Sequence, residues 1–581
     1  MIQIDLEDII EENGYLKNYS SKLKTILIKL LKKILLINEI NKLIFLSGDK
    51  KNLDFIDEIF SSLDFSYKIS KKDIENIPSE GKLIIVANHP LGALDALSIL
   101  KAIGEIRTDV KAIANDMLIN IENIKDLIIP TNTFNSSLGR LSYSQIEEAL
   151  NNEEAVLFFP AAEVSRLSWL KIMDKKWQKG AIHFSKRCGA NILPVYIEAK
   201  NSLLFYLISS VVKKASTLLL PREVFNKRGK IITLHIDAPI PYKAFSTSYI
   251  NIKQQIKLLK RHTYGLKRGK KGIFKTEKNI IHPVNTKLIK KELVNSTVLG
   301  RTSDNKIIYV VSYSEAENTI KEVARLRELT FRRIGEGTGN KLDLDKFDRL
   351  YQHLILWDDD NLEIVGSYRF GYCSKIVSDS GYNSLYTSTL FCYSTEFIEK
   401  YLPCSIELGR SFIQKKYWNS ASLDYLWQGI GLVIAQNPDI KYLFGGVSLS
   451  NALHVDAKNS IVYFYKKYFS NDLNLARSNN SLTFSEKTES ELNILFSSDN
   501  LKGNLQILKK YLKNYGHSIP PLYKHYTDLC DDDGASFLDF GVDPDFENCI
   551  DGLILIEISK IKVAKRNRYI KGSNNQNVAD I

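Results

Sequence analysis

The spacing of apolar residues predicts two regions in which strands alternate with helices. Short β-rich runs at 83–87 (LIIVA), 155–159 (AVLFF) and 191–197 (NILPVYI) are separated by segments with helical spacing, such as 143–154. From about residue 280, a second alternation predicts strands at 306–314 and 362–373 around a helix at 316–334. Alternation of this kind is typical of α/β folds. The chain is therefore predicted to hold two α/β domains.

Length and one basic stretch suggest where these domains begin and end. At 581 residues the chain exceeds what one hydrophobic core usually serves. Residues 257–278 hold nine Lys or Arg against one acid, which is typical of a linker or of a patch facing lipid. These features predict an N-terminal region over 1–45, a first domain over 46–265, a basic linker over 266–280 and a second domain over 281–581.

The N-terminal region carries a basic amphipathic pattern. Residues 22–37 (SKLKTILIKLLKKILL) place leucines and isoleucines along one helical face and lysines opposite. Such a helix can lie in the lipid headgroup layer or pack on its own domain, and the sequence leaves both open. No apolar stretch approaches the roughly 18 residues of a membrane span, and the N-terminus is acidic where a secretory signal is basic. We expect a cytoplasmic protein, peripheral on the inner face of the cell membrane.

Net charge limits the kinds of binding partner that we expect, and the cysteine pattern indicates the redox state of the thiols. A net charge of +12 suits anionic lipid, an acidic carrier protein or nucleic acid, or it only keeps the surface soluble. The chain has neither zinc-finger spacing nor an aromatic RNA-binding signature, so nucleic acid is not expected. The six cysteines are scattered without a CxxC pair, which indicates reduced thiols.

The first candidate site lies where the run LIIVAN breaks at Asn88 and Pro90. His89 and Asp95 fall in the turn and helix start that follow. A neutral imidazole can take a proton from an alcohol, and a carboxylate on its other nitrogen stabilises the imidazolium formed. On spacing alone, a helix cap and a packed residue would explain the two residues better than catalysis does. The pair becomes a catalytic candidate because of its neighbours.

Those neighbours are the block FFPAAEVSR, which contains Glu163 and Arg166, and the segment TNTFNSSLGR, which ends at Arg140. Together with His89 and Asp95 they resemble the glycerolphosphate acyltransferase superfamily, over roughly residues 80–245. This chain has five residues between His and Asp where the superfamily usually has four, and Ala162 stands where it has glycine. The resemblance implies that His89 is the base and that Arg140, Glu163 and Arg166 bind substrate. Alone, the Glu163–Arg166 pair would be read as a surface salt bridge.

The second candidate site draws on elements from 281 to about 570, among them RLRELTFRRI, LDLDKFDRL, GSYRFG and ELGRSFI. They resemble the hemolysin-like amino-acid N-acyltransferases of the GCN5-related fold, and their spacing is similar to that of acyl-homoserine lactone synthases. The residues that carry this similarity are Arg327, Phe331, Asp345, Asp348, Arg369, Glu407 and Arg410.

An amine acceptor must lose a proton before it attacks, and carboxylates near its ammonium can bind it and take that proton. We expect Glu407 and Asp348 to be catalytic, with Glu407 as base beside the thioester cleft of this fold. Asp345, Arg327 and Phe331 are expected to bind substrate. Arg369 and Arg410 would hold the carboxylate of the amino acid or lock the acidic cluster. A buried ion-pair network that only orders the fold is the alternative.

The two resemblances together imply a fused fold, glycerolphosphate-acyltransferase-like and then acyl-homoserine-lactone-synthase-like. They also imply one pathway: the second domain attaches a 3-hydroxyacyl chain to the amine of ornithine or a similar amino acid, and the first esterifies the new hydroxyl. The acyl donor would be a thioester on acyl carrier protein, and neither cofactor nor metal is expected. The predicted partners are acyl carrier protein, the membrane surface, the amino acid and the lyso-lipid. A lysophospholipid acyltransferase with an inactive second domain and a non-enzymatic hemolysin remain alternatives.

Overall fold

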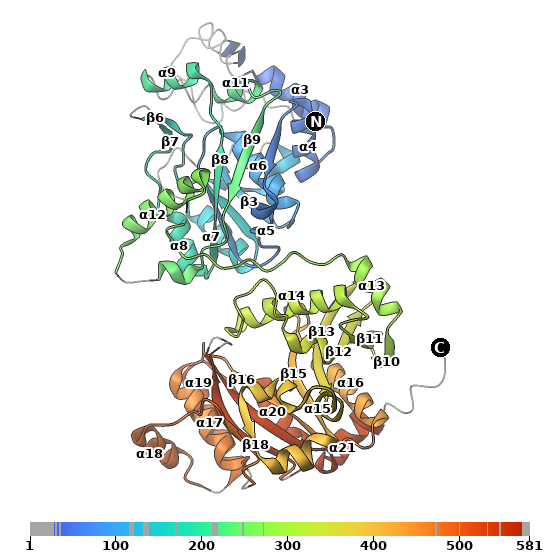
Figure 1. The fold of residues 1–581 in the computed structure, drawn as a ribbon. Coiled ribbons are helices and arrows are strands. Elements are labelled where there is room, and N and C mark those ends of the chain that lie inside the picture. The colour runs from blue at the N-terminus through green and yellow to red at the C-terminus, as the bar shows by residue number, and fades with distance from the viewer. Residues whose placement is uncertain are drawn as a thin grey trace. The chain divides into compact units, whose positions relative to one another are not determined.

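The fold is taken from a computed structural model of the chain, drawn in Figure 1. It describes residues 28–571 except 30–31, 34–35, 116–120, 132–138, 169–170, 212–218, 247–248, 271, 471–472, 499, 532, 545 and 547. Most of the amphipathic segment predicted at 22–37 therefore lies outside the described residues. The chain divides into two compact units, residues 1–282 and 283–581, and each is described by itself. Along the described residues, every helix is too short or too polar to cross a membrane.

Unit 1 is built on one sheet with the strand order β1-β9-β8-β2-β5-β3-β4. The strands run parallel except at the β8–β9 pair, which is antiparallel. In sheet order they are β1 Ser66–Ile69, β9 Ile231–Ile236, β8 Asn191–Glu198, β2 Leu83–Ala87, β5 Ala155–Phe158, β3 Val110–Asn115 and β4 Ile128–Thr131. A short hairpin, β6 Arg166–Ser168 and β7 Lys171–Met173, stands outside this sheet.

Helices cover both faces of this sheet. They are α3 Ile37–Ser47, α4 Asn52–Ser62, α5 Lys71–Glu75, α6 Ala93–Gly104, α7 Arg140–Asn151, α8 Gly180–Cys188, α9 Leu203–Val211, α11 Leu220–Phe225 and α12 Ile252–Gly265. Alternate residues of β2 serve two cores. Leu83 and Ile85 pack with α4 and α6, whereas Ile84 and Val86 pack with α7, α8 and α12. Burial on both faces explains why the strand is an unbroken apolar run.

The segment 266–280, predicted as a linker, is attached to unit 1. Phe274 packs into the core beneath α8 and α12. The amide of Glu277 donates to the Pro239 carbonyl at 2.9 Å, and the Asn279 side chain donates to the carbonyls of Glu75 and Ile77. These contacts explain why unit 1 extends to His282.

Unit 2 is built on a sheet with the order β10-β11-β12-β13-β15-β16-β19-β18. Only the β15–β16 pair of this sheet is parallel among the described strands. In sheet order the strands are β10 Thr297–Arg301, β11 Ile307–Ser312, β12 Gln352–Asp358, β13 Glu363–Tyr372, β15 Ser405–Ile413, β16 Tyr442–Leu449, β19 Cys549–Glu557 and β18 Ala535–Asp543, and a separate pair is β14 Phe391–Tyr393 with β17 Ala476–Ser478.

The helices of unit 2 are α13 Thr286–Val294, α14 Glu317–Ile334, α15 Cys373–Ser380, α16 Ser422–Gln436, α17 Val455–Tyr468, α18 Glu486–Leu495, α19 Leu501–Asn514, α20 Pro521–Leu529 and α21 Val563–Arg566. The apolar sides of α13 and α14 pack on one face of the sheet, and α16, α17, α19 and α20 pack on the other. The prediction of two α/β domains is confirmed, and the strands and helix expected from the apolar spacing are present.

Candidate active sites

His89 and Asp95 form a contact at the carboxyl end of β2. The imidazole Nδ1 lies 3.0 Å from Asp95 Oδ2, and the ring stacks on Phe159 with centroids 4.1 Å apart. Asp95 is fully buried, whereas the His89 side chain keeps 18% of its surface exposed. Burial raises the pKa of Asp95, and the contacts with His89 oppose this rise. The geometry leaves Nε2 as the nitrogen available to a substrate proton.

One carboxylate shapes the turn and holds the histidine. Asp95 lies in the first turn of α6, and its Oδ2 also accepts the amides of Leu91 at 2.7 Å and Gly92 at 3.0 Å. Gly92 has φ 98°, a conformation that favours glycine. The longer His-to-Asp spacing is thus accommodated by a tight turn in which Asp95 accepts the amides of the two residues just before α6.

Asp174 connects this turn with the FFPAAEVSR loop. Its Oδ1 accepts the His89 amide at 3.2 Å and the Ser165 hydroxyl at 2.5 Å. Its Oδ2 accepts the Trp177 indole N–H at 2.8 Å. The Ser165 amide in turn donates to the His89 carbonyl at 2.6 Å. Asp174 is therefore a positioning residue that fixes the backbone on both sides of the imidazole.

The predicted substrate-binding residues of this site are only partly brought together. Arg166 is buried, and its Nε lies 3.3 Å from Glu163 Oε2, while Lys175 contacts the same carboxylate at 3.0 Å. Ala162, the residue that replaces glycine, has φ 57°. Arg140 is exposed at the first position of α7, and residues 132–138 before it lie outside the described residues. Its role as a substrate contact stays a prediction.

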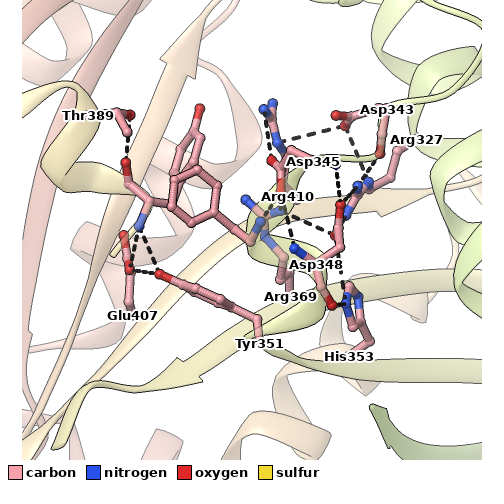
Figure 2. A network of polar contacts seen from close by, with 12 residues as sticks. Arg327, Asp343, Asp345, Asp348, Tyr351, His353, Arg369, Thr389, Glu407 and Arg410 are labelled. Atoms are coloured by element: carbon pink, nitrogen blue, oxygen red, sulfur yellow. Dashed lines mark hydrogen bonds and ion pairs between the residues drawn. The ribbon is translucent and has the colours of Figure 1, made fainter. Parts of the chain in front are cut away.

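The second site is a buried network of arginines and aspartates (Figure 2). Arg327, on α14, holds Asp348 with two parallel hydrogen bonds of 2.8 and 3.0 Å, and its Nε lies 3.2 Å from Asp343. Arg369, on β13, reaches Asp345 at 2.7 Å and Asp348 at 3.2 Å. Burial alone would raise the pKa of Asp348, but the charges of Arg327 and Arg369 outweigh it and hold that pKa well below its ordinary value.

Arg410 completes the network from β15. Its guanidinium lies 3.7 Å from Asp343 and 3.9 Å from Asp345, between the rings of Tyr386 and Phe546. Its backbone φ of 51° is in the left-handed region, which an arginine adopts only when its surroundings hold it there. Buried Nε and Nη2 of Arg369 have no hydrogen-bond partner within the described part of the chain. These donors could bind a carboxylate supplied by a substrate.

Glu407 lies beside the network and is fully occupied by other donors. Its carboxylate accepts the Tyr351 hydroxyl, the Tyr386 amide, and the amide and hydroxyl of Thr387 at 2.7 and 2.6 Å. Figure 2 shows Glu407 and Tyr351 on one side and the arginine–aspartate cluster on the other. Burial raises the pKa of Glu407, while these hydrogen bonds oppose the rise. A base in this position would first have to release a donor.

The strand that carries Glu407 and Arg410 separates from its parallel neighbour. The β15–β16 ladder pairs Ser405 with Tyr442 and ends at Glu407 with Phe444, although both strands continue. Gly445 lies against the Leu408 carbonyl, where any side chain would collide. Backbone groups of β15 beyond Glu407 are thus left without β16 as partner, next to Arg410. This is the position at which we expected a thioester.

Unit 2 also contains a second acidic group that the sequence did not predict. Glu336 follows α14 and is buried, and Asp551, on β19, is buried with the Ser448 hydroxyl at 2.6 Å from its carboxylate. Burial raises the pKa of Glu336 to about 8, the charge of Asp551 adds to this rise, and Arg410 opposes it. Burial likewise raises the pKa of Asp551 to about 6. Both carboxyls can therefore exchange protons near neutral pH.

The raised pKa of Glu336 predicts a stability that falls with pH. Between pH 5 and pH 8 the unfolded chain ionises this group while the folded chain keeps it protonated, so unfolding becomes easier as pH rises. Glu336→Gln removes that dependence. From pH 5 to pH 8 the free energy of unfolding of the wild type should fall by about 3 kcal/mol more than that of Glu336→Gln, at about 1.4 kcal/mol per pKa unit. Urea denaturation at both pH values measures it, with exposed Glu399→Gln as control. An equal pH dependence in wild type and Glu336→Gln would contradict the buried acid.

The structure brings most of the predicted residues of unit 2 together. Arg327, Asp345, Asp348, Arg369 and Arg410 share one network. Phe331 instead packs edge-on against Phe546, 5.6 Å away, which in turn lies under Arg410. Asp343 was missed, although it precedes Asp345 and Asp348 in the segment LDLDKFD and an acidic spacing could have indicated it. Asp174, Glu336 and Asp551 carried no comparable signal.

Two family models match the chain. A family described as "Acyltransferase" matches residues 16–272, and a family described as "Acetyltransferase (GNAT) domain" matches residues 326–428. The first match contains His89, Asp95, Glu163 and Arg166. The second contains the arginine–aspartate network and Glu407.

Relatives with assigned activities match as well. The glycine N(alpha)-acyltransferase of Bacteroides thetaiotaomicron is 35% identical over 306 residues, 50% of this chain and 89% of the relative. The lyso-glycine lipid O-acyltransferase of the same organism is 32% identical over 225 residues, 38% of this chain and 82% of the relative. Among solved structures, a 1-acyl-sn-glycerophosphate acyltransferase of Thermotoga maritima is 18% identical (44% of this chain, 99% of that chain, TM-score 0.25). A CoA-dependent acyl-homoserine lactone synthase is 11% identical (47% of this chain, 97% of that chain, TM-score 0.22).

Proposed function

The chain belongs to the acyltransferases, as an enzyme with an Acyltransferase domain followed by a GNAT domain, and we propose that it makes a diacylated glycine lipid in two steps. In the first, unit 2 would acylate the amine of glycine with a 3-hydroxyacyl chain. In the second, unit 1 would esterify the hydroxyl of that chain. The proposal names glycine where the sequence left the choice between ornithine and a similar amino acid open, because the names of the relatives of both activities refer to glycine or its lyso-lipid.

One observation carries the proposal: a single chain matches two separate proteins of one organism whose names describe successive reactions. The product of a glycine N-acyltransferase that uses a 3-hydroxyacyl donor is a lyso-lipid with a free hydroxyl. That hydroxyl is the group that an O-acyltransferase needs. Fusion of both activities would pass the intermediate from one unit to the other.

In the proposed N-acylation, the free donors of Arg369, with Arg410 beside them, would hold the glycine carboxylate. Asp345 is the most exposed acid of the network and would attract the ammonium. The ammonium loses one proton to a nearby carboxylate, and the resulting amine attacks the thioester carbon. The C–S bond then breaks, and the thiol leaves with a proton. Backbone amides of β15 beyond Glu407 could stabilise the oxyanion.

In the proposed O-acylation, His89 Nε2 takes the proton of the lyso-lipid hydroxyl as its oxygen attacks the second thioester. Asp95, held by two backbone amides, keeps Nδ1 protonated and stabilises the imidazolium that forms. The proton passes to the departing thiolate when the tetrahedral intermediate collapses. Arg166, buried beside Glu163, would orient the acidic end of the lyso-lipid.

The acyl donor and the partners are part of the proposal. We propose acyl carrier protein as donor, because its acidic surface suits a chain with a net charge of +12. A membrane surface would hold the lyso-lipid and attract the same charge.

Expression of the chain in a bacterial host without amino-acid lipids tests this function. Lipid mass spectrometry should find an N-(3-hydroxyacyl)glycine and its O-acylated form. An ornithine lipid in place of the glycine lipid would overturn the choice of amino acid but keep the two reactions. Absence of any N-acylated amino acid, with the protein present and folded, would sink the proposal.

A further inference from the structure

The helix α9, Leu203–Val211, has an unusual composition for the surface of a protein. Its sequence is LLFYLISSV, without a charged residue. A helix that is apolar all around normally lies inside a protein or in lipid. This one is only half covered by its own domain.

The inner side of α9 packs on the FFPAAEVSR loop and is linked by hydrogen bonds to the turn that carries His89. Phe205 and Tyr206 are buried with Val164 and against Leu220 of α11. The Tyr206 hydroxyl accepts the Asn201 amide at 3.0 Å, and the Asn201 side chain donates to the Pro90 carbonyl at 3.0 Å. Only two short links therefore separate α9 from the first active site.

The outer side of α9 exposes large apolar side chains. Leu203, Leu204 and Leu207 are exposed by 80%, 48% and 65%. Leu167, on the β6 strand that α9 contacts, is 42% exposed. Figure 1 shows α9 beside α11, near the β6–β7 hairpin, at one end of unit 1. We name Leu167, Leu203, Leu204 and Leu207 the leucine patch.

Basic residues lie on segments next to those that carry the leucine patch. Lys171 is exposed in the β6–β7 hairpin, Lys200 lies three residues before Leu203, and Arg222 is exposed on α11. At an anionic bilayer surface the leucines would contact acyl chains, and the neighbouring cations would contact lipid phosphates.

From this arrangement we propose that the leucine patch docks unit 1 onto an anionic lipid bilayer, so that a lipid acceptor can reach His89 from the membrane. The occupant is a bilayer, not a second copy of the chain. A two-fold self-contact through this patch would bring Lys171, Lys200 and Arg222 close to their own copies, and like charges oppose such an interface. The inference rests on the proposed function only in taking the acceptor to be a lipid.

Vesicle binding tests the docking without any need for a substrate. The full chain is sedimented with vesicles of equal parts phosphatidylglycerol and phosphatidylcholine. The triple variant Leu203→Asn, Leu204→Asn, Leu207→Asn should bind at least tenfold more weakly than the wild type. A matched triple variant, Val294→Asn, Ile494→Asn, Val563→Asn, changes residues that are at least 68% exposed in unit 2 and should bind within twofold of the wild type.

Activity and size measurements separate the outcomes. With lyso-lipid dispersed in detergent, the Leu203/Leu204/Leu207 variant should keep its O-acylation rate, which shows an intact fold. Unchanged vesicle binding in that variant would overturn the docking, even in a chain that makes glycine lipid. Loss of self-association in sedimentation velocity, without loss of vesicle binding, would assign the patch to a dimer and also overturn it. Docking through the patch in a chain that makes no glycine lipid would leave the docking intact and sink the proposed function.

Discussion

Replacing His89 with alanine is expected to stop the second acylation and leave the first intact. A general base contributes about 10² to 10⁴ in rate, so O-acylation by His89→Ala should fall about a thousandfold. Under the proposed function N-acylation takes place in the other unit, so it should continue. The mono-acylated glycine lipid should therefore accumulate while the diacylated form disappears. Lipid mass spectrometry of cells that express the variant measures both species in one extract.

Two controls make this result specific to the imidazole. His235→Ala removes another partly exposed histidine of unit 1, paired with Glu198 at 3.2 Å, and should leave both products unchanged. Asp95→Asn keeps the size of the side chain but cannot stabilise the imidazolium, so it should lower O-acylation nearly as far. If His89→Ala blocked the N-acylated intermediate instead, the assignment of one reaction to each unit would be wrong.

The parts of the molecule that sequence could predict are those that local rules determine. The fully buried strand LIIVA and the helix at 316–334 follow from their apolar spacing. The contact between His89 and Asp95 was expected from the resemblance that the neighbouring blocks carry. The arginines and aspartates of unit 2 were likewise expected to share one site, because their spacing is similar to that of acyl-homoserine lactone synthases.

Other features depend on which distant segments the fold brings together. Asp174 matters because it reaches His89, 85 positions earlier, and Tyr264, 90 positions later, and no local pattern encodes that meeting. Glu336 and Asp551 influence each other only because the fold brings the end of α14 against β19, where the Cys549 thiol contacts the Gly335 carbonyl. Nothing in the letters ELGRSFI indicates that Arg410 takes a left-handed conformation.

Replacing Glu407 with alanine should abolish both products. The substitution leaves the Tyr351 hydroxyl and the Thr387 amide buried without an acceptor, at a cost of roughly 1–3 kcal/mol for each. The Tyr386 amide keeps the Tyr351 oxygen and the Thr387 hydroxyl keeps the Tyr393 hydroxyl. The loop at 386–387 would lose its anchor, and with it the ring of Tyr386 that packs on Arg369 and Arg410. N-acylation stops, and the diacylated lipid vanishes because its precursor is missing.

The pH dependence of N-acylation tells a base from a positioning residue. If Glu407 accepts the proton, the acidic limb of the kcat/KM profile should disappear in Glu407→Gln. If it only anchors the loop, the limb should remain at a lower amplitude, because another carboxyl, such as Glu336 or Asp551, takes the proton. Glu399→Gln, an exposed change in the same unit, should leave the profile as in the wild type.

Co-expression of the two variants tests whether the two sites act independently. Cells that express the His89→Ala chain and the Glu407→Ala chain as two separate proteins should regain the diacylated lipid. The lyso-lipid made by the first protein is the substrate of the second. Recovery requires that the lyso-lipid leaves one molecule and reaches another through the membrane. Cells that contain both variants in folded form and still lack the diacylated product would show that the intermediate never leaves the chain that makes it, or that Glu407 also supports unit 1. Lyso-lipid added to the purified Glu407→Ala protein separates the two explanations. The lyso-lipid is acylated if the intermediate never leaves the chain that makes it, and it is not acylated if Glu407 also supports unit 1.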